Sequence, residues 1–236
     1  MNQEKCRSIA LYEIAKKILE LPSLGHPIRI GVDGGSASGK TVFADELAKV
    51  LKESNRHIIR AGLDGFHNPP EIRYQKGPMS VEGYVEDSFD YNSVQECILS
   101  PMGPGGNLKF SREVYCHHAE SEKAQDWEVA EKDAILIFEG VMLFRTELID
   151  GFDYKIKIYT SPEVKLERAK VRDLEKFGSI EKLLEKYTKR FLPGQAMYRE
   201  KYRPLEIADV VVHNDDPANP VLAWKEKSAS LPKSSK

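Results

Sequence analysis

The sequence predicts an α/β fold in which helices sandwich a mainly parallel sheet. Short apolar segments, each long enough for one strand, alternate with segments whose apolar residues recur at helical spacing. A glycine-rich turn joins the first of these strands to the helix that follows it. Alternation of this kind is typical of strands that pair in parallel and are covered by helices.

The elements can be assigned in order from the N-terminus. Apolar residues at helical spacing predict an amphipathic helix over the first twenty residues, which Pro22 and Gly25 end. A second helix follows the glycine-rich turn and carries Phe43 and Leu47 on one face. The expected strands cover residues 28–33, 57–64, 134–138, 154–159 and 210–213.

The chain has the length and apolar content of one ordinary α/β domain. Its 236 residues are 41% hydrophobic, which is enough for a sizeable core. We expect an N-terminal helix over residues 1–24, packed on a core domain of residues 25–222, and a polar, disordered tail over residues 223–236. The long segment between the second and third strands is rich in Gly, Pro and Tyr, and this composition suits substrate-binding loops.

The charge balance and the cysteines exclude several classes of protein. Thirty-five Lys and Arg residues oppose 37 Asp and Glu residues, so the net charge of -2 favours neither nucleic acid nor a membrane surface. Cys6, Cys97 and Cys116 are widely spaced, so we expect reduced thiols. We see no secretory signal and no membrane-spanning run. We therefore expect a cytoplasmic protein with small-molecule partners, either a monomer or a homo-oligomer.

The glycine-rich turn matches the pattern GxxxxGK[ST] without a mismatch. It consists of Gly34, Gly35, Ser36, Ala37, Ser38, Gly39, Lys40 and Thr41. Backbone N–H groups of such a loop, together with the helix N-terminus, wrap the phosphates of a nucleotide. Lys40 is expected to bridge the β- and γ-phosphates of ATP, and Thr41 to bind Mg²⁺. The glycines lack GxGxxG spacing, so the pattern predicts a P-loop NTPase-type fold and not a dinucleotide site.

Three carboxylates stand at the ends of predicted strands. Asp64 ends the second strand, so it is expected near the phosphates as the general base that accepts the proton of an attacking hydroxyl, with a Mg²⁺-bound water as a further role. A turn-capping Asp is the alternative. Glu139 follows a buried strand, as a Walker B carboxylate does, and is expected at the magnesium. Asp33 competes as acid or base, but we rank it below Asp64 because its place in the phosphate loop favours a structural role.

A basic helix is predicted from Thr160 or Ser161 onward, with Pro162 in its first turn. Four basic residues fall within about 80° of one another at about 100° per residue. They are Lys165, Arg168, Arg172 and Lys176. On a helical lid over about residues 162–195, Arg168 and Arg172 would neutralise the charge of the transferred γ-phosphoryl group. An ordinary solvated face is the alternative.

Five segments carry a further signal: GVDGGSASGKT, LDGFHNPP, EGYVEDSFDY, IFEG and RFLPGQAMYREKYRPLEIADVVVHNDD. Together they resemble the uridine kinase and phosphoribulokinase family. The resemblance covers roughly residues 27–220. It implies an ATP-dependent kinase with a hydroxyl acceptor, ATP phosphates on residues 34–41, magnesium near Thr41 and Glu139, and a base at Asp64. The sequence contains no NKxD segment and no LSGGQ signature, so a nucleotide-dependent switch ATPase is less favoured.

The same resemblance implies a set of acceptor contacts. These are His67, Arg73, Tyr74, Tyr115, Arg190 and Gln195. The chain departs from the family where relatives often carry an Asp and an Arg beside a His, because it reads Tyr115-Cys116-His117-His118. Adjacent histidines rarely converge on one ion, so we expect no metal there. Uridine or cytidine is the favoured acceptor, and pantothenate or a pentose or sugar phosphate remains the alternative.

Overall fold

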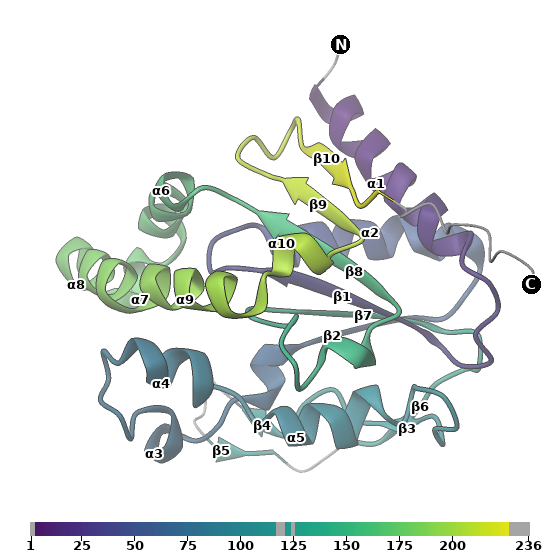
Figure 1. The fold of residues 1–236 in the computed structure, drawn as a ribbon, viewed down its shortest axis with the longest axis horizontal. Helices are drawn as coiled ribbons and strands as arrows, with labels where there is room; N and C mark the ends of the chain where they lie inside the picture. The colour runs from purple at the N-terminus through teal and green to yellow at the C-terminus, as the bar shows by residue number, and fades with distance from the viewer. Residues whose placement is uncertain (1–2, 117–120, 124–125, 227–236) are drawn as a thin grey trace, which may run out of the picture.

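The computed structural model describes residues 3–116, 121–123 and 126–226, which fold around a six-stranded sheet (Figure 1). The strands lie in the order β10, β9, β8, β1, β7, β2. Their bounds are β1 Ile28–Gly34, β2 Ile58–Gly62, β7 Ile135–Gly140, β8 Tyr154–Tyr159, β9 Val210–His213 and β10 Val221–Trp224. Each neighbouring pair is parallel except β9 with β10, which confirms the predicted mainly parallel sheet.

Helices cover the sheet and extend beyond one end of it. The longer ones are α1 (Gln3–Leu19), α2 (Lys40–Leu51), α6 (Pro162–Arg172), α8 (Ile180–Lys186) and α9 (Leu192–Tyr202). The shorter ones are α3 (Pro70–Arg73), α4 (Val81–Glu86), α5 (Tyr91–Val94), α7 (Leu174–Phe177) and α10 (Pro204–Ile207). Helices α6 to α9, which include the residues of the predicted lid, gather at the left of Figure 1, with α3 and α4 below them.

Short segments complete the fold. Single-turn 3₁₀ helices are η1 (Lys52–Ser54), η2 (Leu63–Phe66) and η4 (Ile149–Gly151). Single-turn π-helices are η3 (Gln95–Leu99) and η5 (Tyr187–Phe191). Two small antiparallel ribbons pair β3 (Lys109–Phe110) with β6 (Glu128–Val129), and β4 (Tyr115–Cys116) with β5 (Ser121–Glu122).

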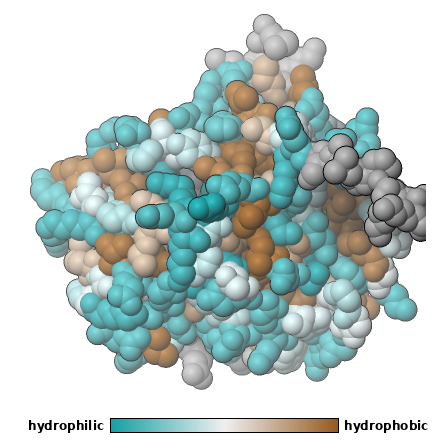
Figure 2. Space-filling view, in the orientation of Figure 1, coloured by the Kyte–Doolittle hydropathy of each residue, from teal (hydrophilic) through white to brown (hydrophobic). Residues whose placement is uncertain are grey.

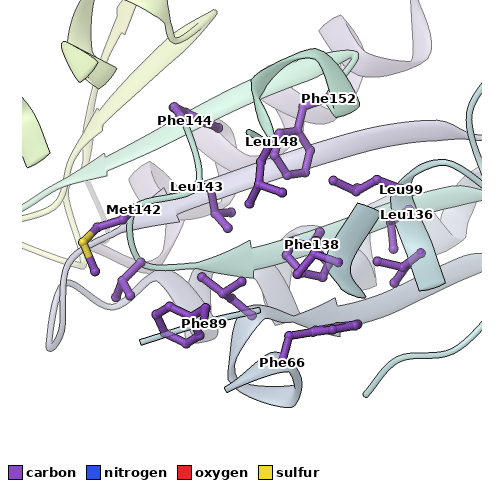
Figure 3. Close-up of a cluster of buried hydrophobic side chains, with 14 of the residues drawn as sticks. Phe66, Phe89, Leu99, Leu136, Phe138, Met142, Leu143, Phe144, Leu148 and Phe152 are labelled. Atoms are coloured by element: carbon purple, nitrogen blue, oxygen red, sulfur yellow. The ribbon is translucent and has the colours of Figure 1, made fainter. Parts of the chain in front are cut away.

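The core lies on both faces of the sheet because successive residues of a strand point to opposite sides. In β7, Ile135 and Ile137 pack with α1 and α2, while Leu136 and Phe138 belong to the cluster on the other face. Figure 3 shows this second cluster, in which the ring centroids of Phe138 and Phe152 lie 6.2 Å apart. Burial on both faces explains why β7 is a continuous apolar run and not an alternating one.

Two expected boundaries differ from the structure. Strand β2 ends at Gly62, and Asp64 lies in the 3₁₀ turn η2 that follows. The predicted tail begins too early, because Ala223 and Trp224 pair with β9 in the antiparallel edge strand β10. The rest of the predicted tail, residues 227–236, lies outside the described residues.

The basic helix is shorter than predicted. Helix α6 ends at Arg172, and Lys176 lies in the separate helix α7. The Asp173 carboxylate accepts hydrogen bonds from Arg172 and from the Tyr187 hydroxyl at this junction. The predicted single stripe of four basic residues is therefore wrong, because the helix that carries the first three ends before the fourth one.

The surface of the visible face is mostly hydrophilic, with an apolar strip near its centre (Figure 2). Within the described ranges, no helix has the length and apolar character needed to cross a membrane. The described cysteine side chains, Cys6 and Cys97, form no disulfide, in agreement with the expected thiols.

Candidate active site

The phosphate loop lies between β1 and α2, as its pattern predicts. Gly39 has a φ of 86°, and a Cβ there would lie 2.7 Å from Nδ2 of Asn214, so the position requires glycine. Gly39 is also the N-cap of α2, and no side chain from the described part of the chain caps this helix. The first N–H groups of α2 therefore point into the loop without a side-chain partner, which suits an anion.

The back of the loop is held through one carbonyl group. The Ser38 carbonyl oxygen accepts hydrogen bonds from Thr160 Oγ1 at 3.1 Å, from Asn214 Nδ2 at 2.8 Å and from Arg168 Nη1 at 3.3 Å. Arg168 Nη2 also donates to the carbonyl oxygens of Asn214, at 2.6 Å, and Asp215, at 3.0 Å. The guanidinium of Arg168 thus joins the loop to the segment after β9, which differs from the expectation that it faces the transferred phosphoryl group.

Glu139 brings a carboxylate to the mouth of the loop. It lies near the end of β7, where it is in register with Val32 of β1 and Gly62 of β2. Thr41 Oγ1 donates to Glu139 Oε1 at 3.1 Å, and Lys40 Nζ lies 3.7 Å from Oε2. Among the described residues, Glu139 Oε2 is buried without a hydrogen-bond partner. Mg²⁺ prefers oxygen ligands such as hydroxyl and carboxylate groups. The Thr41 hydroxyl and the Glu139 carboxylate, whose Oε2 has no hydrogen-bond partner among the described residues, therefore fit the ion.

Asp64 stands at the end of the neighbouring strand β2. It follows Gly62, the partner of Glu139, by two residues, and its side chain is exposed. The Asp64 carbonyl oxygen lies 2.9 Å from Nδ1 of His67. The sheet therefore brings Asp64 and Glu139 to the same edge, and the Asp64 carboxylate is accessible to a ligand.

A cavity of about 350 Å³ is lined in part by the residues that follow η2. Its lining residues are His67, Asn68, Pro69, Asp90, Ser93, Val114, Tyr115 and Lys123. Burial lowers the pKa of His67, so its imidazole is neutral at pH 7. The Tyr115 hydroxyl is buried without a hydrogen-bond partner among the described residues. Two of the six expected acceptor residues, His67 and Tyr115, thus line one cavity.

The other four expected acceptor residues lie elsewhere. Arg73 and Tyr74 lie at the end of α3, while Arg190 and Gln195 lie in η5 and α9. Tyr74 is surrounded by cations, because Arg73 lies 5.3 Å and Arg190 5.0 Å from the centre of its ring. Gln195 Oε1 accepts a 2.8 Å hydrogen bond from Lys165 Nζ, and a Cβ on Gly35 would lie 2.1 Å from that same oxygen. Gln195 therefore packs on the phosphate loop and not on the cavity.

The basic residues of α6 point in three directions. Lys165 is buried against Gln195, and burial lowers the pKa of Lys165 to about 8. Arg168 binds the back of the loop, and Arg172 forms an ion pair with Asp173 at 2.7 Å. Nothing in these contacts brings Arg172 to the loop. Helical periodicity places Lys165, Arg168 and Arg172 on one face of α6. Their long side chains nevertheless contact three different partners, because each bends toward the nearest packed group.

Asp33, which we ranked below Asp64 as a candidate acid or base, lies in the interior of the protein. It is fully buried, and its Oδ2 accepts from Lys157 Nζ at 2.8 Å and from the Tyr198 hydroxyl at 2.9 Å. Asp33 therefore joins the end of β1 to β8 and α9. His117 and His118 lie outside the described residues, and the described part of the chain holds no cluster of three His, Cys, Asp or Glu residues that could bind a metal.

A phosphate loop between β1 and α2 and a carboxylate near the end of the adjacent strand β7, on a mainly parallel sheet flanked by helices, define a P-loop kinase. The profile described as the phosphoribulokinase / uridine kinase family matches residues 29–213. The chain belongs to this family of ATP-dependent kinases, whose members phosphorylate an alcohol group.

Individual relatives agree with the family match. The chain is 33% identical to uridine-cytidine kinase B of Dictyostelium discoideum over 171 residues, which cover 72% of this chain and 68% of the relative. It is 27% identical to the uridine kinase of Brevibacillus brevis over 194 residues, covering 80% and 86%. The structure of a possible uridine kinase from Bacillus stearothermophilus superposes with a TM-score of 0.67 at 21% identity, covering 86% of this chain and 97% of that one. That last likeness shows the shared fold.

Proposed function

We propose that this protein transfers the γ-phosphoryl group of ATP to a hydroxyl of uridine or cytidine. The observation that carries the proposal is the order of features along one sheet edge. Thr41 of the phosphate loop bonds Glu139, and Glu139 is in register with Gly62, two residues before Asp64. The Asp64 carbonyl oxygen contacts His67, which lines the 350 Å³ cavity. Phosphoryl donor, base and acceptor can thus occupy neighbouring places.

On the donor side, the loop binds and orients the triphosphate. Main-chain N–H groups of residues 34–41 meet the phosphate oxygens, and Lys40 Nζ leaves its 3.7 Å contact with Glu139 to bind the β- and γ-phosphates. Thr41 and Glu139 would hold Mg²⁺, which would supply positive charge to the phosphate oxygens. The role of the chain is to place the γ-phosphorus at the end of the loop that faces Asp64.

On the acceptor side, Asp64 receives a proton. The acceptor oxygen forms a bond to the γ-phosphorus, the bond from that phosphorus to the bridging oxygen breaks, and ADP leaves with the electron pair. The hydroxyl proton passes to the Asp64 carboxylate. Its exposure suits this role, because the carboxylate can contact a ligand without breaking an existing hydrogen bond to a described side chain.

The choice of acceptor rests on two kinds of support. The cavity is within the range of about 300–1,000 Å³ that small-molecule sites occupy. Relatives that match most of their length carry the names uridine kinase and uridine-cytidine kinase. Pantothenate and pentose or sugar phosphates are the competing acceptors, since the lining of the cavity offers hydrogen-bonding groups to any of them.

A panel of acceptors tests the proposal. Uridine, cytidine, pantothenate, ribose 5-phosphate and fructose are each incubated with Mg²⁺ and ATP, and ADP formation and the phosphorylated product are both measured. We expect product with uridine or cytidine and none with the Lys40→Ala variant as a matched control. Product with only another member of the panel would overturn the assigned acceptor, and ATP hydrolysis independent of every acceptor would overturn the kinase reaction.

A further inference from the structure

The N-terminal helix α1 contacts the segment behind the phosphate loop through one arginine. The side chain of Arg7 is only 14% exposed, and its Nε donates to Glu46 Oε2 of α2 at 2.6 Å. Its Nη1 donates to the Pro217 carbonyl oxygen at 2.8 Å and to Asn214 Oδ1 at 3.3 Å. The guanidinium thus joins α1 both to α2 and to the segment that follows β9.

Asn214 connects this arginine to the loop itself. The residue is 1% exposed, and its Nδ2 donates to the Ser38 carbonyl oxygen at 2.8 Å. A Cβ on Gly39 would lie 2.7 Å from the same Nδ2, so the amide packs directly on two consecutive loop residues. Arg7 and Asn214 therefore form a short chain of hydrogen bonds that ends on the phosphate loop.

Arg7 fixes which end of the Asn214 amide faces the loop. An amide side chain has an acceptor oxygen and a donor nitrogen, whereas a guanidinium has donors alone. Arg7 therefore holds Oδ1 on its own side, and Nδ2 faces the Ser38 carbonyl. The reversed amide would bring two oxygens together at Ser38 and two donors together at Arg7, and buried polar groups without partners cost free energy.

The Ser38 carbonyl in turn sets the direction of a group that can bind phosphate. In a planar trans peptide unit, the carbonyl oxygen and the N–H of the next residue point in opposite directions. Asn214, Thr160 and Arg168 all donate to the Ser38 carbonyl oxygen. The Gly39 N–H therefore points away from these three donors, and the hydrogen bonds to the carbonyl also polarise the peptide unit, which strengthens this N–H as a donor.

We infer that Arg7 is a positioning residue for ATP, because through Asn214 it holds the Ser38–Gly39 peptide unit in the conformation that binds the triphosphate. Arg7 and Asn214 both lie outside residues 29–213, which match the family profile, so family membership does not assign this role. The inference rests on the binding of ATP by the loop under the proposed function, and it does not depend on which acceptor is used.

The test measures the Kd of Mg·ATP for wild type, Arg7→Met, Asn214→Leu and the double variant by titration calorimetry. We expect each single variant to bind Mg·ATP about 5- to 10-fold more weakly than wild type. Because Arg7 acts through Asn214, adding Arg7→Met to Asn214→Leu should change the Kd by less than about twofold. If Arg7 served only to pack α1 on α2, the losses in the double variant would instead multiply.

Tyr12→Phe is the matched control for α1. It removes another hydrogen bond of this helix, from the Tyr12 hydroxyl to Glu53 Oε1 at 2.6 Å, which does not reach the loop. Its Kd for Mg·ATP should equal that of wild type. Thermal melts without nucleotide establish that each variant is folded, and Asn214→Ser, which also removes the amide, replaces Asn214→Leu in the cycle if the larger side chain prevents folding.

Three results would overturn the inference. They are an unchanged Kd in folded Arg7→Met, losses that multiply in the double variant, and a loss in Tyr12→Phe as large as that in Arg7→Met. Failure of wild type to bind Mg·ATP would instead reject the kinase reaction itself, so the two failures are distinguishable.

Discussion

The Thr41 hydroxyl donates a 3.1 Å hydrogen bond to Oε1 of Glu139, although 98 residues separate the two along the chain. Strand β7 lies next to β1 in the sheet, so the end of β7 brings Glu139 to the first turn of α2. The bond holds the carboxylate toward the loop before any ligand arrives, and the buried Oε2 remains without a hydrogen-bond partner among the described residues. This pair prepares a binding place for a divalent cation at the phosphate loop.

Replacement of Glu139 by glutamine should raise the Mg²⁺ requirement of the enzyme. The amide keeps the size of the side chain but removes the charge that Mg²⁺ contacts through oxygen or water. We expect the Mg²⁺ concentration for half-maximal rate to increase about 10- to 100-fold. Initial rates against Mg²⁺ at saturating ATP measure this, with Glu147→Gln as a control outside the loop. An unaltered Mg²⁺ dependence would reject the assignment of Glu139.

Asp64→Asn should abolish phosphoryl transfer while ATP still binds. The asparagine cannot accept the hydroxyl proton, so kcat should fall by about 10²- to 10⁴-fold. Lys40→Ala should also abolish transfer, but it should weaken ATP binding because Lys40 contacts the phosphates. Rapid-quench kinetics and nucleotide titrations distinguish the two variants. Equal loss of ATP affinity in both would show that Asp64 is not the base.

Arg168→Ala should weaken ATP binding more than Arg172→Ala does. Arg168 holds the Ser38 carbonyl at the back of the loop and the segment after β9, so its loss should raise the KM for ATP roughly tenfold. Arg172 is more than half exposed and pairs with Asp173, so its loss should change stability by less than about 1 kcal/mol. Steady-state kinetics and thermal melts check both. A large fall in kcat for Arg172→Ala, with normal binding, would restore that arginine to the catalytic centre.

The buried Lys165 should make stability rise with pH. Burial, followed by the charges of Arg199 and Lys157, lowers its pKa from 10.5 to about 8 in the folded protein. Below pH 8 Lys165 is protonated in both the folded and the unfolded protein, so folding buries a charge at full cost. Between pH 8 and 10.5 Lys165 loses its proton in the folded protein but keeps it in the unfolded protein, so the free energy of unfolding rises with pH. Relative to Lys165→Met, wild type should gain on the order of 1–2 kcal/mol of unfolding free energy from pH 7.5 to 9.5.

Urea unfolding of both proteins at the two pH values measures this difference. The pH dependence of every other titratable group is the same in wild type and Lys165→Met and cancels in the difference. The change in that difference between the two pH values therefore reports on Lys165 alone. A constant difference across this range would show that Lys165 keeps an ordinary pKa.

Local patterns predicted the parts of this protein that depend on a few adjacent residues. The phosphate loop, the helix after it and the buried strand before Glu139 each follow from short segments of the sequence. The position of Asp64 was predicted at a strand end, and it lies in the turn just after the strand. These predictions succeeded because backbone geometry and strand burial leave a strong local signature.

Side-chain directions could not be predicted in the same way. Arg168, Arg172 and Lys165 share a helix face by periodicity, but they contact three different partners. The sequence predicted no role for Tyr84 beyond its place in a segment that resembles the family. Its burial depends on packing against α9, which adjacent residues do not encode. In the structure Tyr84 packs against Gly194 of α9 and lies 5.5 Å from the Arg190 guanidinium carbon.

The amino-acid sequence by itself determined the α/β fold, the phosphate loop and the carboxylates that follow two of its strands, because strand burial and loop conformation are encoded within a few residues. The tertiary structure alone decided which side chains converge. Thr41 meets Glu139, Gln195 meets Gly35 and Arg190 meets Tyr84 only because distant segments pack together, and the free energy of those contacts depends on burial that no local pattern contains.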